Sequence, residues 1–230
     1  MSARRGVLSL MAVVMALAAV GNRAAQAAPS PASSTETPLT SAPLITEHLI
    51  VSPAGPYTTV AAALAAAQPG ATIEVHGGVY PALVVDKPVT LIGVEWPVLD
   101  GGGRGTVVQI TAADVTLRGF VVRNSGDEPD RDHSGVIVAG DRALVEGNRL
   151  EEVLFGIFVS QAADAVLRGN EIAGKLKYEE ARRGDAIRLW YARHTLIENN
   201  SIHDVRDLVI WYSQQTTLRG NRVERARYAI

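Results

Sequence analysis

The chain has 230 residues, with 22 lysines and arginines against 24 aspartates and glutamates, which gives a formal net charge of −2. A mildly acidic chain without a basic stripe argues against a nucleic-acid partner. Cysteine is absent, so there is no disulfide framework and stability must come from core burial. All three methionines lie within the first 15 residues.

The first 27 residues have the three-part layout of a secretory signal peptide. Arg4 and Arg5 precede the apolar run 7–20, and small residues at Ala25 and Ala27 flank Gln26 at a typical cleavage site. The apolar run is too short to cross a bilayer comfortably. We therefore predict export to the periplasm, cleavage after Ala27 and no transmembrane segment in the mature chain.

A change of composition follows the predicted cleavage site. Residues 28–43 are rich in Pro, Ser and Thr and nearly lack large apolar side chains, which predicts a flexible linker. The structured domain is then expected to span residues 44–230. Near its start, the segment YTTVAAALAAAQPG predicts a short helix that begins at Thr58 or Thr59 and ends at Pro69-Gly70. We expect this helix to cover the open end of the first repeat.

A repeat of about 22 residues organises the rest of the chain. It is marked by the segments VEGNRL, LRGNEI, IENNSI and LRGNRV, with an earlier copy, LRGFVV. The asparagine position of these segments is held by Asn148, Asn170, Asn200 and Asn221, and by Phe120 in the earlier copy. Aligned asparagines of this kind can form a hydrogen-bonded ladder along stacked strands.

Three aliphatic columns keep register with the asparagine position, and alternation of apolar and polar residues around them is typical of half-buried strands. Three residues before it stand Leu117, Val145, Leu167, Ile197 and Leu218; two after it stand Val122, Leu150, Ile172, Ile202 and Val223; eleven before it stand Ile137, Val159, Leu189 and Ile210. The pattern predicts an all-β fold, a right-handed parallel β-helix whose repeats stack to share one core. Because the sequence stops inside an aligned strand, we also expect C-terminal repeats to be missing.

Two repeats carry an insertion at the same point of the coil, at residues 124–134 and 174–184. Equal placement puts both insertions on one side of the solenoid, two repeats and roughly 10 Å apart. Two interpretations remain open: a binding face, or two solvated loops that only form salt bridges with each other.

The segments IRLWY and VIWY align Trp190 with Trp211 and Tyr191 with Tyr212. Alternation turns the tryptophans outward, so the indoles are expected to stack, either as a sugar or protein interface or as a ladder that only stabilises the coil. Asp185 is the best single candidate for an acid catalyst, although Gly-Asp before a strand also suits a plain turn. The predicted binding surface comprises Asp127, Asp130, Asp132, Arg182, Arg183, Asp185, Trp190 and Trp211.

Catalytic and metal motifs are not evident. The five histidines, His48, His76, His133, His194 and His203, show no ligand spacing. Acids do not recur in the tight clusters that β-helix glycosidases and calcium-dependent lyases require. We predict no catalytic residues, and we leave a metal site unassigned.

Most of residues 45–230 resembles the NosD family, above all in GDAIRLWY followed by DLVIWYS. The resemblance implies a non-enzymatic periplasmic protein that works with an ABC-type ATPase and permease to assemble the copper-sulfur centre of nitrous oxide reductase. It also implies copper for the full-length family, whereas copper(I) prefers thiolate and thioether ligands that the mature chain lacks. We therefore expect no cofactor in this portion. The alternative is a β-helix that binds or degrades polysaccharide.

Overall fold

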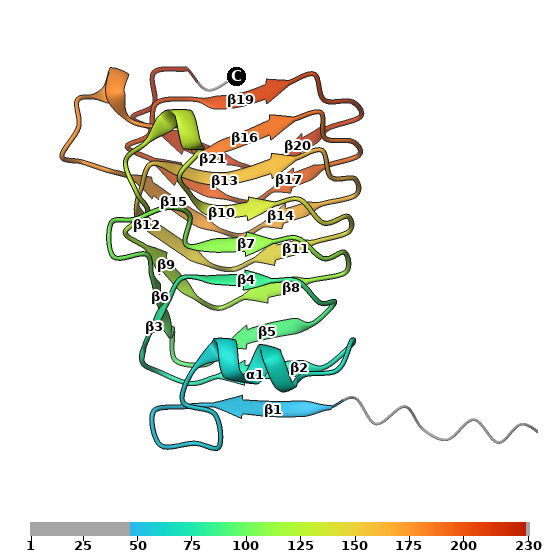
Figure 1. Ribbon diagram of the computed structural model, residues 1–230. Coiled ribbons are helices and arrows are strands. Elements are labelled where there is room, and N and C mark those ends of the chain that lie inside the picture. The colour runs from blue at the N-terminus through green and yellow to red at the C-terminus, as the bar shows by residue number, and fades with distance from the viewer. Residues whose placement is uncertain (1–46, 229–230) are drawn as a thin grey trace, which may run out of the picture. The chain divides into compact units, whose positions relative to one another are not determined.

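Short parallel strands wind into a stack of repeats in the computed structural model, which describes residues 47–228 (Figure 1). The predicted signal peptide and linker, residues 1–27 and 28–43, lie outside the described residues. Within the described part, the chain forms strands β1 to β21, the helix α1 and two 3-10 turns, η1 (Pro129–Arg131) and η2 (Glu180–Arg182). No helix in this part of the chain has the length and apolar character needed to cross a membrane.

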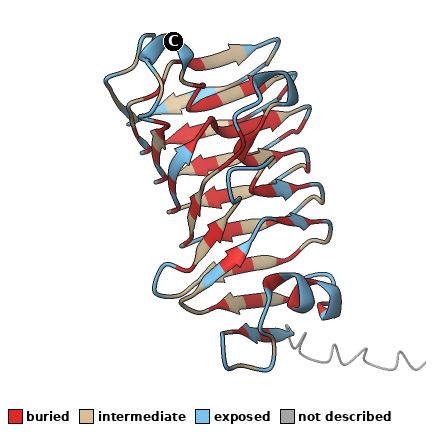
Figure 2. Cartoon of the chain, turned by 60° about the vertical axis from the view of Figure 1, so that its left-hand side comes forward, coloured by how far each residue is buried: buried red, intermediate tan, exposed pale blue. Residues whose placement is uncertain are grey.

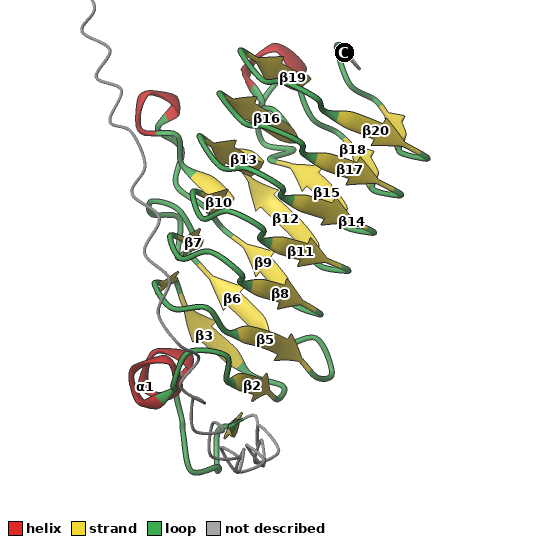
Figure 3. Cartoon of the chain, turned by 90° about the vertical axis from the view of Figure 1, so that its right-hand side faces the viewer, coloured by secondary structure: helices red, strands yellow, loops and turns green. Residues whose placement is uncertain are grey.

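Three parallel sheets form the walls of the solenoid, because each strand pairs with the equivalent strand one repeat later (Figure 3). The eight-stranded sheet contains β1 (His48–Val51), β2 (Thr72–Val75), β5 (Thr90–Gly93), β8 (Thr116–Arg118), β11 (Leu144–Glu146), β14 (Val166–Arg168), β17 (Leu196–Glu198) and β20 (Thr217–Arg219). The seven-stranded sheet contains β3 (Val79–Pro81), β6 (Val98–Asp100), β9 (Val121–Arg123), β12 (Arg149–Val153), β15 (Glu171–Gly174), β18 (Ser201–His203) and β21 (Arg222–Glu224). The six-stranded sheet contains β4 (Leu83–Val85), β7 (Val108–Ile110), β10 (Ser134–Val138), β13 (Phe155–Ser160), β16 (Ile187–Trp190) and β19 (Leu208–Trp211).

The core runs along the axis, because inward positions recur in every repeat (Figure 2). Two of the predicted aliphatic columns are confirmed in full by the strand register: Leu117, Val145, Leu167, Ile197 and Leu218 face one another, as do Val122, Leu150, Ile172, Ile202 and Val223. One burial pattern thus repeats on both sheets, which identifies the repeat as one structural unit.

The third column was predicted correctly except at Ile137. Val138, and not Ile137, pairs with Val159 and is fully buried, while Ile137 pairs with the outward Phe158. The segment between this strand and the next asparagine position is one residue shorter in that repeat. A one-residue slip reverses the face on which every side chain lies.

The predicted asparagine ladder is present and lies at the turn between the eight-stranded and seven-stranded sheets. Asn148 Nδ2 donates to Asn170 Oδ1 (3.2 Å), Asn170 Nδ2 to Asn200 Oδ1 (3.0 Å) and Asn200 Nδ2 to Asn221 Oδ1 (2.9 Å). Each of these side chains also donates to a backbone carbonyl, as Asn170 does to Val145. The ladder therefore satisfies buried polar groups that the sharp turn would otherwise leave without partners.

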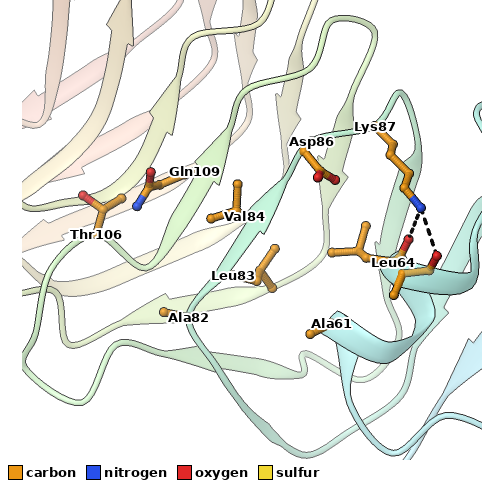
Figure 4. A pocket seen from close by; sticks show the side chains of 10 residues that line it. Ala61, Leu64, Ala82, Leu83, Val84, Asp86, Lys87, Thr106 and Gln109 are labelled. Carbon is orange, nitrogen blue, oxygen red and sulfur yellow. Dashed lines mark hydrogen bonds between the residues drawn. The ribbon is translucent and has the colours of Figure 1, made fainter.

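The predicted short helix is α1 (Val60–Ala66), and the Thr59 side chain accepts a hydrogen bond from the backbone N–H of Ala62 at its start. The helix packs beside β4, the first strand of the six-stranded sheet, while β1 is the first strand of the eight-stranded sheet. It thus covers the N-terminal edge of one sheet. Lys87 Nζ donates to the carbonyls of Leu64, Ala65 and Ala67 at the helix C-terminus (Figure 4). The ammonium charge interacts favourably with the helix dipole, and its hydrogen bonds satisfy the last carbonyls of the helix.

Candidate functional site

The two insertions meet on one side of the solenoid, as their equal placement predicts. The Lys175 ammonium, which is only 4% exposed, donates to the carbonyl of Ser125 and to the carboxylate of Asp127. Lys177 Nζ donates to the other oxygen of Asp127 at 2.7 Å. The salt bridges that one of the two interpretations expected are thus present, and they fasten the second insertion to the first.

Asp127 is the centre of this connection, and its pKa reflects it. Partial burial of the carboxyl opposes ionisation, but the hydrogen bonds from Lys175 and Lys177 outweigh it and lower the pKa of Asp127 to about 2. The carboxylate is consequently ionised at any pH near neutrality. Such a group holds two loops together and cannot donate a proton.

Asp185 belongs to a second network, at the start of β16. Its side chain is fully buried and accepts from Arg206 Nη2 at 2.7 Å and from Arg188 Nε at 3.2 Å. Arg188 Nη1 in turn donates to Asp132 of the first insertion, and Arg206 Nε donates to Asp207 at 3.0 Å. Two guanidinium groups thus neutralise the carboxylate that the sequence singled out as the best acid candidate.

The aligned tryptophans are neighbours on β16 and β19, as expected, but they do not stack. The Trp190 and Trp211 rings meet edge to face, with centroids 5.9 Å apart and planes at 75°. The stacked pair is Tyr191 and Tyr212, with centroids 5.0 Å apart and planes at 12°. The expectation of stacked indoles is wrong because the edge-to-face geometry is also favourable for aromatic rings and lets Trp190 contact Tyr212 as well.

The structure separates the eight predicted surface residues into two groups. Asp132, Asp185, Trp190 and Trp211 gather around Arg188 on the outer side of the six-stranded sheet. Asp127, Asp130, Arg182 and Arg183 lie in the insertions; Asp130 and Arg182 are exposed, and Arg183 Nε donates to the carbonyl of Tyr178 at 3.0 Å. The first insertion reaches, through Asp132, the aromatic cluster formed by Trp190 and Trp211 with Arg188.

Sequence reasoning missed Arg188 and Phe158, which complete the first group. The Arg188 guanidinium lies 4.0 Å from the ring centre of Phe155, 5.3 Å from that of Phe158 and 5.6 Å from that of Trp211. Alternation within IRLW does turn Arg188 outward, so part of the signal was present. Its partner Asp132 is 56 residues earlier in the chain, however, and no local pattern links the two.

A hollow of about 330 Å³ lies within this group. It is lined by residues of the first insertion and of β13, β16 and β19, and by the turn after β13: Asp132, Phe158, Ser160, Gln161, Arg188, Trp190 and Trp211. Another hollow, of about 420 Å³, lies at the far end of the solenoid between α1, β4 and β7 (Figure 4), away from every predicted site residue.

The described residues do not fit copper(I). The chain has no cysteine, and the three methionines precede residue 47. Among residues 47–228, no three His, Cys, Asp or Glu side chains form a group able to hold a metal ion. Two histidines do share one carboxylate, since His48 Nε2 and His76 Nε2 lie 3.3 and 2.7 Å from the oxygens of Glu74, but both imidazoles contact the acid and not a common centre.

Two curated proteins are similar to this chain over about half its length. A protein of Pseudomonas aeruginosa described as a probable ABC transporter binding protein NosD is 29% identical over 126 residues, which cover 54% of this chain and 29% of that protein. A protein of Stutzerimonas stutzeri with the same description is 29% identical over 125 residues, with the same coverage. The resemblance to NosD is thus confirmed, and the matched part spans less than a third of either relative.

Solved structures share the architecture at low sequence identity. The catalytic domain of an alpha-1,3-glucanase is 12% identical, with a TM-score of 0.54 over 83% of this chain and 40% of that chain. A pectin methylesterase of Erwinia chrysanthemi is 15% identical, with a TM-score of 0.42 over 75% of this chain and 81% of that chain. At such identities the likeness concerns the fold alone.

A family model gives the classification directly. Residues 105–230 match the model described as a right handed beta helix region. This segment starts just before β7 and includes both insertions, the asparagine ladder and the aromatic cluster. The predicted fold class is confirmed: the chain belongs to the right-handed β-helix family.

Proposed function

We propose that this chain is a non-enzymatic accessory protein of an ABC-type system that assembles the copper-sulfur centre of nitrous oxide reductase. The proposal rests on the similarity to the two proteins described as probable ABC transporter binding proteins NosD. The ATPase, the permease and the reductase are its proposed partners. Copper is, in this proposal, the cargo of the system and not a cofactor held by these repeats.

The structural feature that supports the proposal is the insertion wall, residues 124–134 and 174–184. The contacts of Lys175 and Lys177 with Asp127 fix two long loops on one rigid scaffold. A preorganised surface binds a folded partner with little loss of conformational entropy. Cationic side chains already engage the carboxylates of Asp127, Asp132 and Asp185, which supports a role in recognition over one in proton transfer.

The experiment is a gene deletion with matched complementation. In the deletion strain we expect nitrous oxide reductase to accumulate without the visible absorption of its copper-sulfur centre, and we expect the wild-type gene to restore it. Asp127→Lys places a third cation beside Lys175 and Lys177, so this variant should restore the centre poorly. Asp114→Lys is the control, because Asp114 also forms an ion pair, with Arg142 at 2.7 Å, but lies outside the insertion wall. A full copper-sulfur centre in the deletion strain would refute the proposal.

The proposed site of action is the periplasm. We expect N-terminal sequencing of the exported protein to return Ala28 as the first residue, since Ala25 and Ala27 flank a typical cleavage position. An exported protein that still begins at Met1 would contradict the predicted cleavage.

A further inference from the structure

Two hollows adjoin on the outer side of the last three described strands of the six-stranded sheet, β13, β16 and β19. The first is the hollow of about 330 Å³ beside Arg188. The second, of about 520 Å³, lies at the turn that follows these strands and is lined by Gln161, Tyr191, Arg193, Tyr212 and Gln214. Gln161 lines both, so together they form one extended groove, named here the aromatic groove.

The strand register explains why a groove exists at this place. Ser160, Trp190 and Trp211 occupy one outward column, in which each residue pairs with the next. Ser160 is the small member, so its repeat leaves a space beside the Trp190 ring. Figure 1 shows the first insertion in front of these strands, and from it Asp132 closes the groove on one side.

The next column turns aromatic rings into the second hollow. Gln161, Tyr191 and Tyr212 follow the three strands and have φ values of 60°, 50° and 51°. A left-handed backbone conformation is unfavourable for tyrosine, yet both repeats that have a tyrosine at this position adopt it. The result is a parallel pair of rings at the groove, in which Tyr191 is 52% and Tyr212 67% exposed.

The charges of the groove nearly balance. Its lining contains one carboxylate, Asp132, and two guanidinium groups, Arg188 and Arg193. Arg188 also pairs with the buried Asp185 behind the groove, which accepts a further hydrogen bond from Arg206. An anionic polymer would require a clear excess of cations.

The chemistry of the lining narrows the ligand further. Exposed Trp and Tyr faces alternate with planar or hydroxylated polar side chains: Asp132, Gln161, Arg188 and Gln214, together with Ser160. A protein partner typically buries an apolar centre within a polar rim, whereas here polar groups are interspersed with the rings. A ligand with apolar C–H faces and hydroxyl edges matches this alternation.

We infer that the aromatic groove binds a neutral oligosaccharide, whose sugar faces pack on Trp211 and on the Tyr191–Tyr212 pair while its hydroxyls meet Asp132, Gln161 and Arg188. This inference goes beyond the proposed role in nitrous oxide reductase maturation and does not depend on it. It assigns a ligand class to one groove and leaves the insertion wall for protein partners.

The test is a titration of the full exported chain with neutral hexasaccharides of glucose, xylose and N-acetylglucosamine, and with hexagalacturonate as the anionic probe. The chain contains three tryptophans, Trp96, Trp190 and Trp211. In a Trp96→Phe variant the tryptophan fluorescence therefore comes only from the two residues of the groove. We expect at least one neutral hexasaccharide to quench this fluorescence saturably. Trp211→Ala and Tyr212→Ala, followed by calorimetry, should each weaken binding by about tenfold.

The matched control is Trp96→Ala, because Trp96 is also exposed (42%) and also contacts an arginine, Arg149 at 4.0 Å, but lies outside the groove. It should leave the affinity unchanged. Circular dichroism of each variant separates loss of binding from loss of fold. Three results would overturn the inference: no binding of any neutral hexasaccharide, tighter binding of hexagalacturonate, or equal effects of the Trp96 and Trp211 substitutions. None of them bears on the deletion experiment above, so the two proposals fail separately.

Discussion

At the scale of single residues, the clearest measurable consequence concerns Asp127. Its pKa in the folded chain, about 2, lies below the value of about 3.9 of an unfolded aspartate. The ionised group therefore stabilises the fold at pH values above about 4, and this contribution is lost as the pH falls toward 2. Because the side chain is 35% exposed, water screens the ion pairs and the effect should be small.

We predict that Asp127→Asn lowers the melting temperature by no more than a few degrees at pH 7, and that the difference from the wild type shrinks between pH 5 and pH 2. Thermal unfolding followed by circular dichroism at several pH values measures this. Asp130→Asn is the control, since Asp130 is an exposed residue of the same insertion. A difference that stays constant down to pH 2 would show that the carboxylate is not what fastens the loops.

A second prediction at this scale compares neighbours on β14. Leu167 is fully buried, so Leu167→Asp should lower the free energy of unfolding by about 4 kcal/mol or more. The Arg168 side chain is 43% exposed, and its partner Glu198 keeps a second arginine, Arg219; Arg168→Ala should cost less than about 1 kcal/mol. Urea unfolding of both variants gives the comparison. Equal losses would mean that the register of the eight-stranded sheet is wrong.

At the scale of elements, three asparagines of the ladder, Asn148, Asn170 and Asn200, each link three repeats. Asn170 accepts from the backbone N–H of Asn148 at 3.0 Å and donates to Asn200 and to the carbonyl of Val145. Phe120 interrupts the ladder in the earlier repeat, where its N–H donates to Asn148 Oδ1 and its ring is fully buried. This position can thus hold either an asparagine of the ladder or an apolar core residue. Its side chain decides which hydrogen bonds the neighbouring repeat can form.

We therefore predict that Asn170→Ala destabilises the fold by about 2–3 kcal/mol, because it removes the side-chain partner of the buried N–H of Asn148 and of the Val145 carbonyl in the preceding repeat, and of the Asn200 side chain in the next. Asn221→Ala should cost less, since Asn221 is half-buried in the last described turn of the ladder and water can replace its side chain. Unfolding in urea distinguishes the two. A loss at Asn221 equal to that at Asn170 would indicate that the ladder acts as one cooperative unit.

The elements also show how far the sequence determines the fold and the site. Strand positions, the helix and the ladder could be predicted because they follow from short-range alternation and from a repeat that stacks on itself. The position of Ile137 could not, because one turn is a residue shorter and reverses the face. The pairing of Asp132 with Arg188, and of Asp185 with Arg206, depends on which side chains the stacked repeats bring together, and alternation alone does not encode it.

At the scale of the whole molecule, the solenoid gives its two ends different surfaces. At the N-terminal end, α1 packs beside β4, and Lys87 donates hydrogen bonds to the last carbonyls of this helix. The insertion wall and the aromatic groove both lie in the later repeats, within the part that matches the family model. Strands pair only with the equivalent strands of neighbouring repeats, and the contacts of the insertions span two repeats. A substitution in the groove should therefore leave the N-terminal repeats unaffected, which makes the groove and wall variants interpretable.

The last prediction concerns copper and the exported chain as a whole. We expect residues 28–230 to lose copper(I) to a competing chelator, because this part of the sequence contains neither cysteine nor methionine, and these are the ligands that copper(I) prefers. Imidazoles are the remaining donors, and two of the five, His48 and His76, contact Glu74, while His133 Nδ1 accepts the N–H of Glu128 at 3.2 Å. Absorbance of the copper–chelator complex measures the competition, with a His48→Ala/His76→Ala double variant as the control that should behave like the wild type. Sub-nanomolar affinity that disappears on replacement of any one histidine would contradict the prediction and identify that histidine as a copper ligand.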